Sequence, residues 1–103
     1  MDITVQELKK KLDNAEKFVF IDVREPYEHQ EFSIGGDLIS LGHVMDSIPA
    51  LEEFKNDEIV VYCRSGNRSG MAQSLLESAG FTNVRNLTGG VLAWQEAFGN
   101  KVP

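Results

Sequence analysis

The sequence predicts an α/β fold, a three-layer sandwich in which a mainly parallel central sheet of about five short strands is flanked by helices. Two continuous apolar runs, Phe18–Ile21 and Ile59–Tyr62, have the pattern of strands buried on both faces. Segments with helical periodicity alternate with these runs, which is typical of a parallel sheet. The chain has 103 residues and contains no internal repeat and no linker rich in Pro, Gly or Ser. Residues 1–103 are therefore predicted to form a single domain.

The N-terminal half begins with a helix and reaches a second short strand. Thr4 and Glu7 have the spacing of a capping box, and an apolar stripe follows them. After the first strand, Pro26 is suited to open a short helix that extends to Phe32. Leu38–Ile39 is the candidate second strand. This half thus supplies one helix before the first strand and another between the first two strands.

The C-terminal half repeats the alternation of helix and strand. A weak helix is expected over Val44–Phe54, interrupted or bounded by Pro49. A longer helix follows the second apolar run and stops at Gly80, and Val84–Leu87 is the candidate last strand. Gly89–Gly90 then turns the chain into a final helix. The apolar residues of that helix are Val91, Leu92, Trp94 and Phe98.

Composition and charge exclude several classes of function. Hydrophobic residues make up 42% and charged residues 25% of the chain, as in soluble globular domains. The net charge of −6, with scattered basic residues, disfavours nucleic acid and membranes as partners. A single cysteine forms no internal disulfide, and with His29 and His43 it makes no zinc site, so no metal is expected. Without a visible signal peptide or an apolar run long enough to span a bilayer, a cytoplasmic location is expected.

The segment after the second apolar run carries the chemistry. Cys63, the only cysteine, ends the predicted strand, and a polar turn leads from it into a helix. In open parallel sheets, ligands bind beyond the carboxyl ends of the strands, and a turn that enters a helix there directs several backbone N–H groups to one point. Gly66 lets the turn bend, and Arg64 and Arg68 add two positive charges. These features predict a small anion-binding cradle with the sulfur atom at its base.

Such a cradle favours the thiolate form of Cys63. A free cysteine has a pKa of about 8.5, whereas thiols at helix N-termini beside cations fall to about 3.5–7.5. Because the thiolate is the nucleophile, Cys63 is the predicted catalytic residue. The alternative is an inert, small hydrophobic residue that ends a strand, which the charged and polar turn disfavours. The predicted substrate-binding residues are Arg64, Ser65, Gly66, Asn67, Arg68 and Ser69.

Three segments occur in the order expected for one known family. Cys63–Ser69 resembles the active-site loop of the rhodanese-like domain family, which includes the single-domain thiosulfate sulfurtransferases. Ile21–Pro26 resembles its early strand-end motif, and Leu87–Trp94 resembles its closing glycine pair and tryptophan. One departure is Ser33–Asp37, where many relatives carry His-Ile-Pro-Gly-Ala. This departure lies outside the reactive loop, but the resemblance then gives no prediction for the second strand and the adjoining surface.

The resemblance implies a sulfurtransferase that needs no metal or cofactor. A small anionic donor such as thiosulfate would leave a persulfide on Cys63, and cyanide, a small thiol or a relay protein's cysteine would accept the sulfur. Backbone N–H groups of the loop would stabilise the persulfide anion. Arg64 would draw in the donor from the rim, while Arg68 would hold either the donor or the scaffold. Asp22 would support the loop, with Arg68 as a candidate partner, and Arg24 would share that role; a surface salt bridge is the alternative for both.

Other functions remain as alternatives. A sulfur-relay module needs the same loop as an enzyme, whereas a catalytically silent binding domain needs no thiol. Cysteine phosphatases and arsenate reductases are disfavoured, because the phosphatase loop places five residues between cysteine and arginine, and only four separate Cys63 from Arg68. His29 and His43 have no motif that links them to the cysteine, so exposed or capping roles are expected for both.

Overall fold

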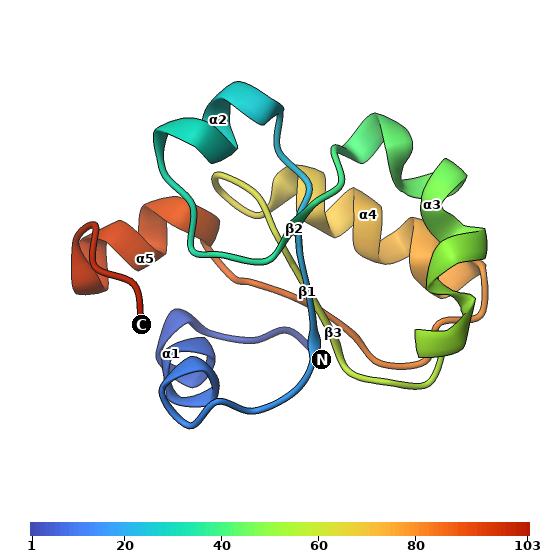
Figure 1. The fold of residues 1–103 in the computed structure, drawn as a ribbon, viewed down its shortest axis with the longest axis horizontal. Coiled ribbons are helices and arrows are strands. Elements are labelled where there is room, and N and C mark those ends of the chain that lie inside the picture. Colours follow the sequence, from blue (N-terminus) through green and yellow to red (C-terminus); the bar gives the residue numbers. More distant parts are fainter.

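The central sheet contains four parallel strands in the order β2-β1-β3-β4 (Figure 1). The computed structural model describes all 103 residues. The predicted parallel sheet is confirmed, with four strands in place of about five. Ile3 pairs with Leu87 as a single-residue bridge beside the last strand, because the capped first helix begins only two residues later, at Val5. The strands are β1 (Val19–Asp22), β2 (Asp37–Leu38), β3 (Ile59–Tyr62) and β4 (Val84–Asn86).

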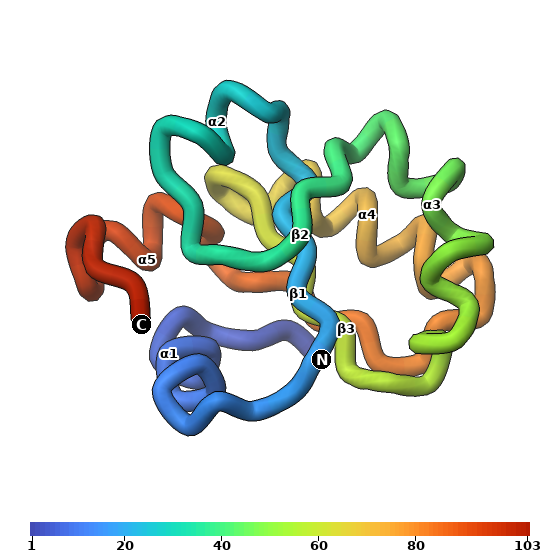
Figure 2. The backbone as a smooth tube through the Cα atoms, in the orientation of Figure 1, coloured from blue at the N-terminus to red at the C-terminus, as the bar shows by residue number.

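Helices cover both faces of this sheet, so the predicted three-layer sandwich is confirmed. α1 and α5 pack on one face and α3 and α4 on the other, as the ribbon and the backbone tube both show (Figures 1 and 2). α2 buries no side chain and lies beyond the carboxyl end of β1 (Figure 1). None of the helices is long and apolar enough to cross a bilayer. The helices are α1 (Val5–Asp13), α2 (Pro26–Glu31), α3 (Val44–Leu51), α4 (Asn67–Ser78) and α5 (Gly90–Phe98), with 3-10 turns at Leu41–His43 and Glu52–Phe54.

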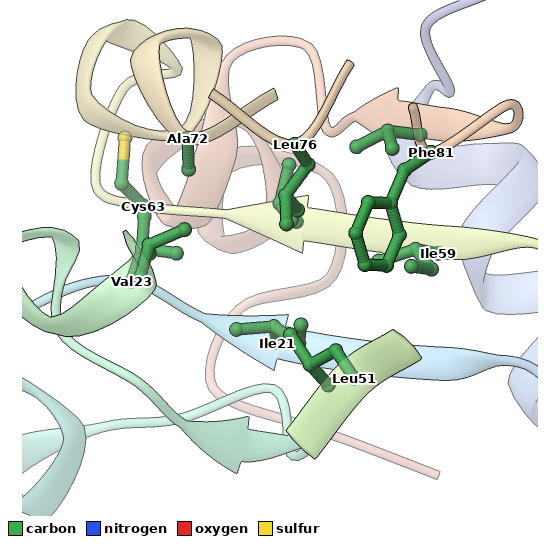
Figure 3. Packing of buried hydrophobic residues seen from close by; sticks show 11 residues of the cluster. Ile21, Val23, Leu51, Ile59, Cys63, Ala72, Leu76 and Phe81 are labelled. Atoms are coloured by element: carbon green, nitrogen blue, oxygen red, sulfur yellow. The ribbon is translucent and has the colours of Figure 1, made fainter. Parts of the chain in front are cut away.

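The continuous apolar run of β3 follows from its central position. Successive side chains of a strand point to opposite faces. Ile59, Val61 and Cys63 accordingly join the core cluster under α3 and α4 that Figure 3 shows. Val60 and Tyr62 join the cluster under α1 and α5. Because both faces are covered, every side chain of this strand is buried, and the strand that presents Cys63 is held rigidly.

The local signals for helix ends are confirmed, with one exception. Thr4 and Glu7 form the capping box that opens α1, and Pro26 is the first residue of α2. Pro49, however, lies inside α3 and neither interrupts nor bounds it, so that expectation was wrong. Pro49 removes one N–H from the helical ladder, but the helix continues to Leu51, whose buried side chain anchors the turn that follows the proline.

Candidate active site

A short loop joins the end of β3 to the start of α4 at the carboxyl edge of the sheet. The strand ends at Tyr62, Cys63 follows it, and the helix begins at Asn67. Gly66, the residue before the helix, has φ of 107°, a conformation that side chains rarely adopt. The turn therefore requires glycine here, and it folds the chain back so that its amides surround the preceding cysteine. In Figure 1 this loop lies between α2 and α4.

The predicted convergence on the cysteine sulfur is present. The Gly66 N–H donates to Cys63 Sγ at 3.1 Å, and the Ser69 hydroxyl donates to the same atom at 3.3 Å. Burial opposes ionisation of the thiol, but hydrogen bonds from the Ser69 hydroxyl and from the amides of Ser69, Gly66 and Ser65 outweigh it and lower the pKa of Cys63. Cys63 is only 1% exposed, so the sulfur lies at the base of the cradle, as the sequence predicts. Figure 3 shows the sulfur at the end of its strand, beside α4.

Asn86, at the end of the neighbouring strand β4, fixes the shape of the loop. Its side-chain oxygen accepts a hydrogen bond from the Ser69 hydroxyl at 2.6 Å, and its side-chain amide donates to the Gly66 carbonyl at 3.0 Å. Both residues that donate to the sulfur are thus held by one side chain. Sequence reasoning did not identify Asn86. The available signal was a polar residue at the carboxyl end of a strand.

The glycine pair at the start of α5, Gly89 as its N-cap and Gly90 as its first residue, allows that helix to begin directly against the loop. The N–H of Val91 donates to the Cys63 carbonyl at 2.9 Å, and the N–H of Leu92 donates to the Arg64 carbonyl at 3.0 Å. Gly90 has φ of +57°, and a Cβ there would collide with the Cys63 carbonyl oxygen and lie 2.6 Å from that of Arg64. These bonds satisfy two carbonyls of the loop with the first free N–H groups of α5 and so hold the start of that helix against the loop.

Arg68 is held by α2. Its guanidinium donates two hydrogen bonds to the Glu28 carboxylate, at 2.7 and 2.9 Å. This bidentate pair lowers the pKa of Glu28 to about 2 and raises that of Arg68. Of the two roles left open for Arg68, the structure therefore favours support of the scaffold. The arginine joins the first turn of α4 to the helix on the other side of the loop.

Asp22 and Arg24 form a buried pair that does not include Arg68. The Arg24 side chain donates to both Asp22 oxygens at 2.8–3.2 Å and to the Phe32 carbonyl at 2.6 Å, and its backbone N–H donates to Asp22 at 3.0 Å. His29 Nδ1 lies 2.8 Å from the same carboxylate. The suggested pairing of Asp22 with Arg68 was wrong, because these groups saturate its oxygens. The alternative of a surface salt bridge is also wrong, since both residues are buried.

This network supports the loop indirectly. Burial opposes ionisation of Asp22, but the hydrogen bonds from Arg24 and His29 outweigh it and lower the pKa of Asp22. The network ties the last turn and the C-cap of α2 to the end of β1, and α2 carries the Glu28 that holds Arg68. The expectation of a merely exposed or capping His29 was therefore wrong, whereas His43 is exposed. No sequence motif linked His29 to Asp22, seven residues before it.

The outer side of the loop is open to solvent. Arg64, Ser65 and Asn67 are exposed, and Arg64 makes no ion pair. Beside the loop lies a cleft of about 280 Å³ between α2 and α5. Its lining includes Tyr27, Glu31, Arg64 and Leu92. The site thus has a deeply placed, ionisable sulfur, a rim that carries one free cation, and a cleft alongside.

Comparison with known proteins agrees with this arrangement. Residues 4–97 match the family model described as a rhodanese-like domain. The chain is 34% identical over 93 residues to a protein of Allochromatium vinosum named sulfurtransferase, covering 90% of this chain and 86% of that one. It is 37% identical over 98 residues to the maize adenylyltransferase and sulfurtransferase MOCS3-1, covering 89% of this chain but 21% of that protein. Several similar relatives are likewise at least twice as long as the matched segment.

Solved structures give the same assignment. The rhodanese-like domain protein from Staphylococcus aureus superposes with a TM-score of 0.83 at 30% identity, covering 100% of this chain and 99% of that one. The family model spans nearly the whole chain, and the reactive loop, its glycine bend and the closing glycine pair are all present in the fold. The chain therefore belongs to the rhodanese-like domain family.

Proposed function

We propose that the chain is a sulfurtransferase that takes sulfane sulfur from thiosulfate or another persulfide donor onto Cys63. It then passes the sulfur to a thiophilic acceptor, which is cyanide, a small thiol or a protein thiol. One observation carries this proposal: the Gly66 N–H and the Ser69 hydroxyl both donate to the Cys63 sulfur, whose pKa is lowered. A thiolate is the nucleophilic form of cysteine, so the loop favours the reactive species. The sulfurtransferase names of the relatives support the same reaction class.

In the first half-reaction the Cys63 thiolate attacks the outer sulfur of thiosulfate. A new S–S bond forms to Cys63 as the bond between the two sulfur atoms of thiosulfate breaks, and sulfite leaves with that electron pair. The product is a Cys63 persulfide anion, and no metal or redox cofactor takes part. The Gly66 N–H and the Ser69 hydroxyl stabilise the anion, because they already donate to the sulfur and need no reorganisation. Arg64, exposed and without an ion-pair partner, draws the dianionic donor to the rim.

In the second half-reaction an acceptor attacks the outer sulfur of the persulfide. The S–S bond to Cys63 breaks, and the Cys63 thiolate leaves with the electron pair. A thiol acceptor has first lost its proton to solvent, whereas cyanide attacks directly and becomes thiocyanate. The same hydrogen bonds that lower the pKa of Cys63 make it a better leaving group. The same loop therefore assists both half-reactions, sulfur uptake by Cys63 and sulfur release from it.

A relay-type module is the second candidate. Some relatives are larger proteins in which a similar segment accompanies an adenylyltransferase, which favours transfer to a defined protein partner. A phosphatase is disfavoured by the four-residue spacing between Cys63 and Arg68 and by the engagement of Arg68 with Glu28, which draws its guanidinium away from an oxyanion. A silent binding domain is disfavoured because it needs no ionisable thiol.

The proposal is tested by thiocyanate formation from thiosulfate and cyanide. Wild type is expected to turn over and Cys63→Ser to be inactive, while Arg64→Gln raises KM for thiosulfate because it removes the free cation at the rim. Hydrolysis of para-nitrophenyl phosphate is measured in parallel. Activity retained by Cys63→Ser, or phosphate hydrolysis without sulfur transfer to any acceptor, would overturn the proposal.

A further inference from the structure

Exposed apolar side chains gather at the edge of the sheet that carries Cys63. Apart from Met1 and Val102 near the chain ends, the exposed large hydrophobic residues are Tyr27, Met45, Met71 and Leu92. Tyr27, Met45 and Leu92 lie in the first turns of α2, α3 and α5, and Met71 lies in the second turn of α4. Strand and helix alternate here, with α2 after β1, α3 after β2, α4 after β3 and α5 after β4. Since all four strands are parallel, the first turns of these helices lie at the same edge of the sheet.

Tyr27 and Leu92 form opposite walls of the cleft beside the reactive loop. Tyr27 belongs to α2 and Leu92 to α5, and both line the space of about 280 Å³. The α5 wall is joined to the loop itself, because the Leu92 N–H donates to the Arg64 carbonyl at 3.0 Å. Leu92 is thus held close to the residue that follows Cys63. An occupant of the cleft lies next to the loop that encloses the sulfur.

The cleft also carries one unpaired charge of each sign. Arg64 and Glu31 both line it, and neither makes an ion pair within the chain. The other charged groups there are engaged, Arg24 with Asp22 and Glu28 with Arg68. Thiosulfate and cyanide have neither an apolar part nor a positive charge, so they use only one of these features. An apolar segment with a carboxylate and a cation beside it matches all of them.

We propose that this cleft, with Tyr27 and Leu92 as its walls, binds an extended peptide segment of a protein acceptor and brings its cysteine to the persulfide on Cys63. The inference rests on the proposed sulfurtransferase function and names its acceptor class. The segment carries an apolar side chain next to the cysteine, a carboxylate that pairs with Arg64 and a cation that pairs with Glu31. The cleft volume of about 280 Å³ lies just below the range of pockets for drug-sized ligands, which starts at about 300 Å³. It therefore accommodates a few side chains of an extended segment.

The deep position of the Cys63 sulfur favours an acceptor that is bound to the protein during transfer. Cys63 is almost completely buried, and the outer sulfur of a persulfide extends only about 2 Å beyond Sγ. A thiol that meets this sulfur from solution must find a narrow approach in each encounter. A segment bound along the adjacent cleft presents its thiolate there repeatedly, which raises the effective concentration of the nucleophile. The transfer itself forms one S–S bond to the acceptor and breaks the one to Cys63, which leaves as thiolate.

The test isolates the second half-reaction. The protein is loaded with thiosulfate, the persulfide is verified by intact mass, and the donor is removed by desalting. Single-turnover transfer is then measured to 2-mercaptoethanol and to an acetylated, amidated tetrapeptide, Lys-Leu-Cys-Glu. The peptide is expected to show saturation and a higher second-order rate constant than 2-mercaptoethanol. With the wild-type protein, a peptide with Gln in place of Glu is expected to show a second-order rate constant at least threefold lower.

Protein variants test whether the walls of the cleft cause the preference for the peptide. Tyr27→Ser combined with Leu92→Ser is expected to lower the ratio of the peptide and 2-mercaptoethanol rate constants at least fivefold. Val102→Ser is the control, because Val102 at 45% exposure matches Leu92 at 44% and lies in the C-terminal tail. Equal rates for the two peptides in wild type, or a ratio that the double variant does not change, would overturn the inference alone. Failure of loading would instead refute the proposed function and the inference with it.

Discussion

The carboxylate of Glu28 accepts two hydrogen bonds from the guanidinium of Arg68, at 2.7 and 2.9 Å, and so joins α2 to the first turn of α4. The two residues are forty positions apart, and the reactive loop lies between the helices that carry them. A bidentate pair of this kind fixes orientation as well as distance. The closed shape of the loop therefore depends on a residue outside the loop.

Replacing Glu28 by Gln is expected to destabilise the protein and slow sulfur transfer. The substitution removes a charge-assisted pair. Hydrogen bonds to charged groups contribute about 1.5–3 kcal/mol, and solvent at the partly exposed Arg68 weakens the pair, so a loss of about 1–2 kcal/mol is expected. For a domain of this size, 1 kcal/mol corresponds to a fall in Tm of about 4–8 °C. Glu77→Gln, an exposed acid on α4 without an ion pair, is the control. Equal melting curves for the Glu28 and Glu77 variants would contradict this role.

The difference between wild type and Glu28→Gln is expected to depend on pH. The folded-state pKa of Glu28, about 2, lies below the ordinary value for glutamate, about 4.3. The stabilisation is therefore fully present above the ordinary value and is lost as pH falls through the folded value. Urea unfolding of both proteins between pH 6 and pH 2 should show the two free energies of unfolding converging toward the acid end. A difference that stays constant across this range would show that the ion pair is not its source.

Ser69→Ala is expected to raise the pKa of the Cys63 thiol. The Ser69 hydroxyl donates to Sγ at 3.3 Å and is the largest single contribution that favours the thiolate. Alkylation of the single cysteine by iodoacetamide, followed across pH, should shift its midpoint to higher pH in this variant. Ser65→Ala is the matched control, because Ser65 acts through its backbone N–H, which alanine retains. A shift of the same size in both variants would mean that the hydroxyl does not act on the sulfur.

Asp22→Asn is expected to be strongly destabilising. It leaves the buried guanidinium of Arg24 without its counter-charge, a change that typically costs about 3–5 kcal/mol. Asp22→Asn combined with Arg24→Met removes both charges and is expected to recover part of the loss, as measured by urea unfolding. A double variant less stable than Asp22→Asn would indicate that the arginine acts through packing rather than through the pair.

Gly90→Ala is expected to disrupt the loop more than an ordinary glycine substitution would. Its Cβ would meet the backbone carbonyls of Cys63 and Arg64, neither of which can move without opening the loop. Gly99→Ala separates steric contact from backbone strain, because Gly99 also has a positive φ but has nothing within 4 Å of a Cβ. The control is expected to lose about 1–3 kcal/mol and retain transfer activity, whereas Gly90→Ala loses activity. Equal losses of stability and activity would contradict the assigned contact.

Much of the fold could be predicted from local patterns. The apolar run of β3 indicated a strand covered on both faces, and the capping box of Thr4 and Glu7 marked the start of α1. The sheet has four strands and not about five, because Ile3 pairs with Leu87 only as a single-residue bridge. How many residues pair beside β4 depends on where the N-terminal segment lies in space, which local patterns do not show. The helix α3 continues through Pro49, which local sequence does not predict, because the effect of a proline on a helix depends on how the next turn packs.

The parts of the site formed by residues adjacent in the chain could be predicted from the sequence. The contacts from residues distant in the chain could not. Cys63 and the bend at Gly66 follow each other along the loop, so their relationship was visible in the sequence. Asn86 and Glu28 reach the loop from other elements, and no spacing rule connects them to it. The partner of Asp22 was misassigned for the same reason. The cytoplasmic location stays a prediction.

The proposed transfer requires the thiol of Cys63 to carry the sulfur atom as a persulfide, and the intact mass of the protein reports this carrier state. Reduced protein is incubated with thiosulfate, desalted and weighed with and without dithiothreitol. We expect wild type to gain the mass of one sulfur atom, which dithiothreitol removes and which Cys63→Ser never acquires. A wild-type mass unchanged after thiosulfate, polysulfide and a persulfide donor in turn would contradict the proposed transfer.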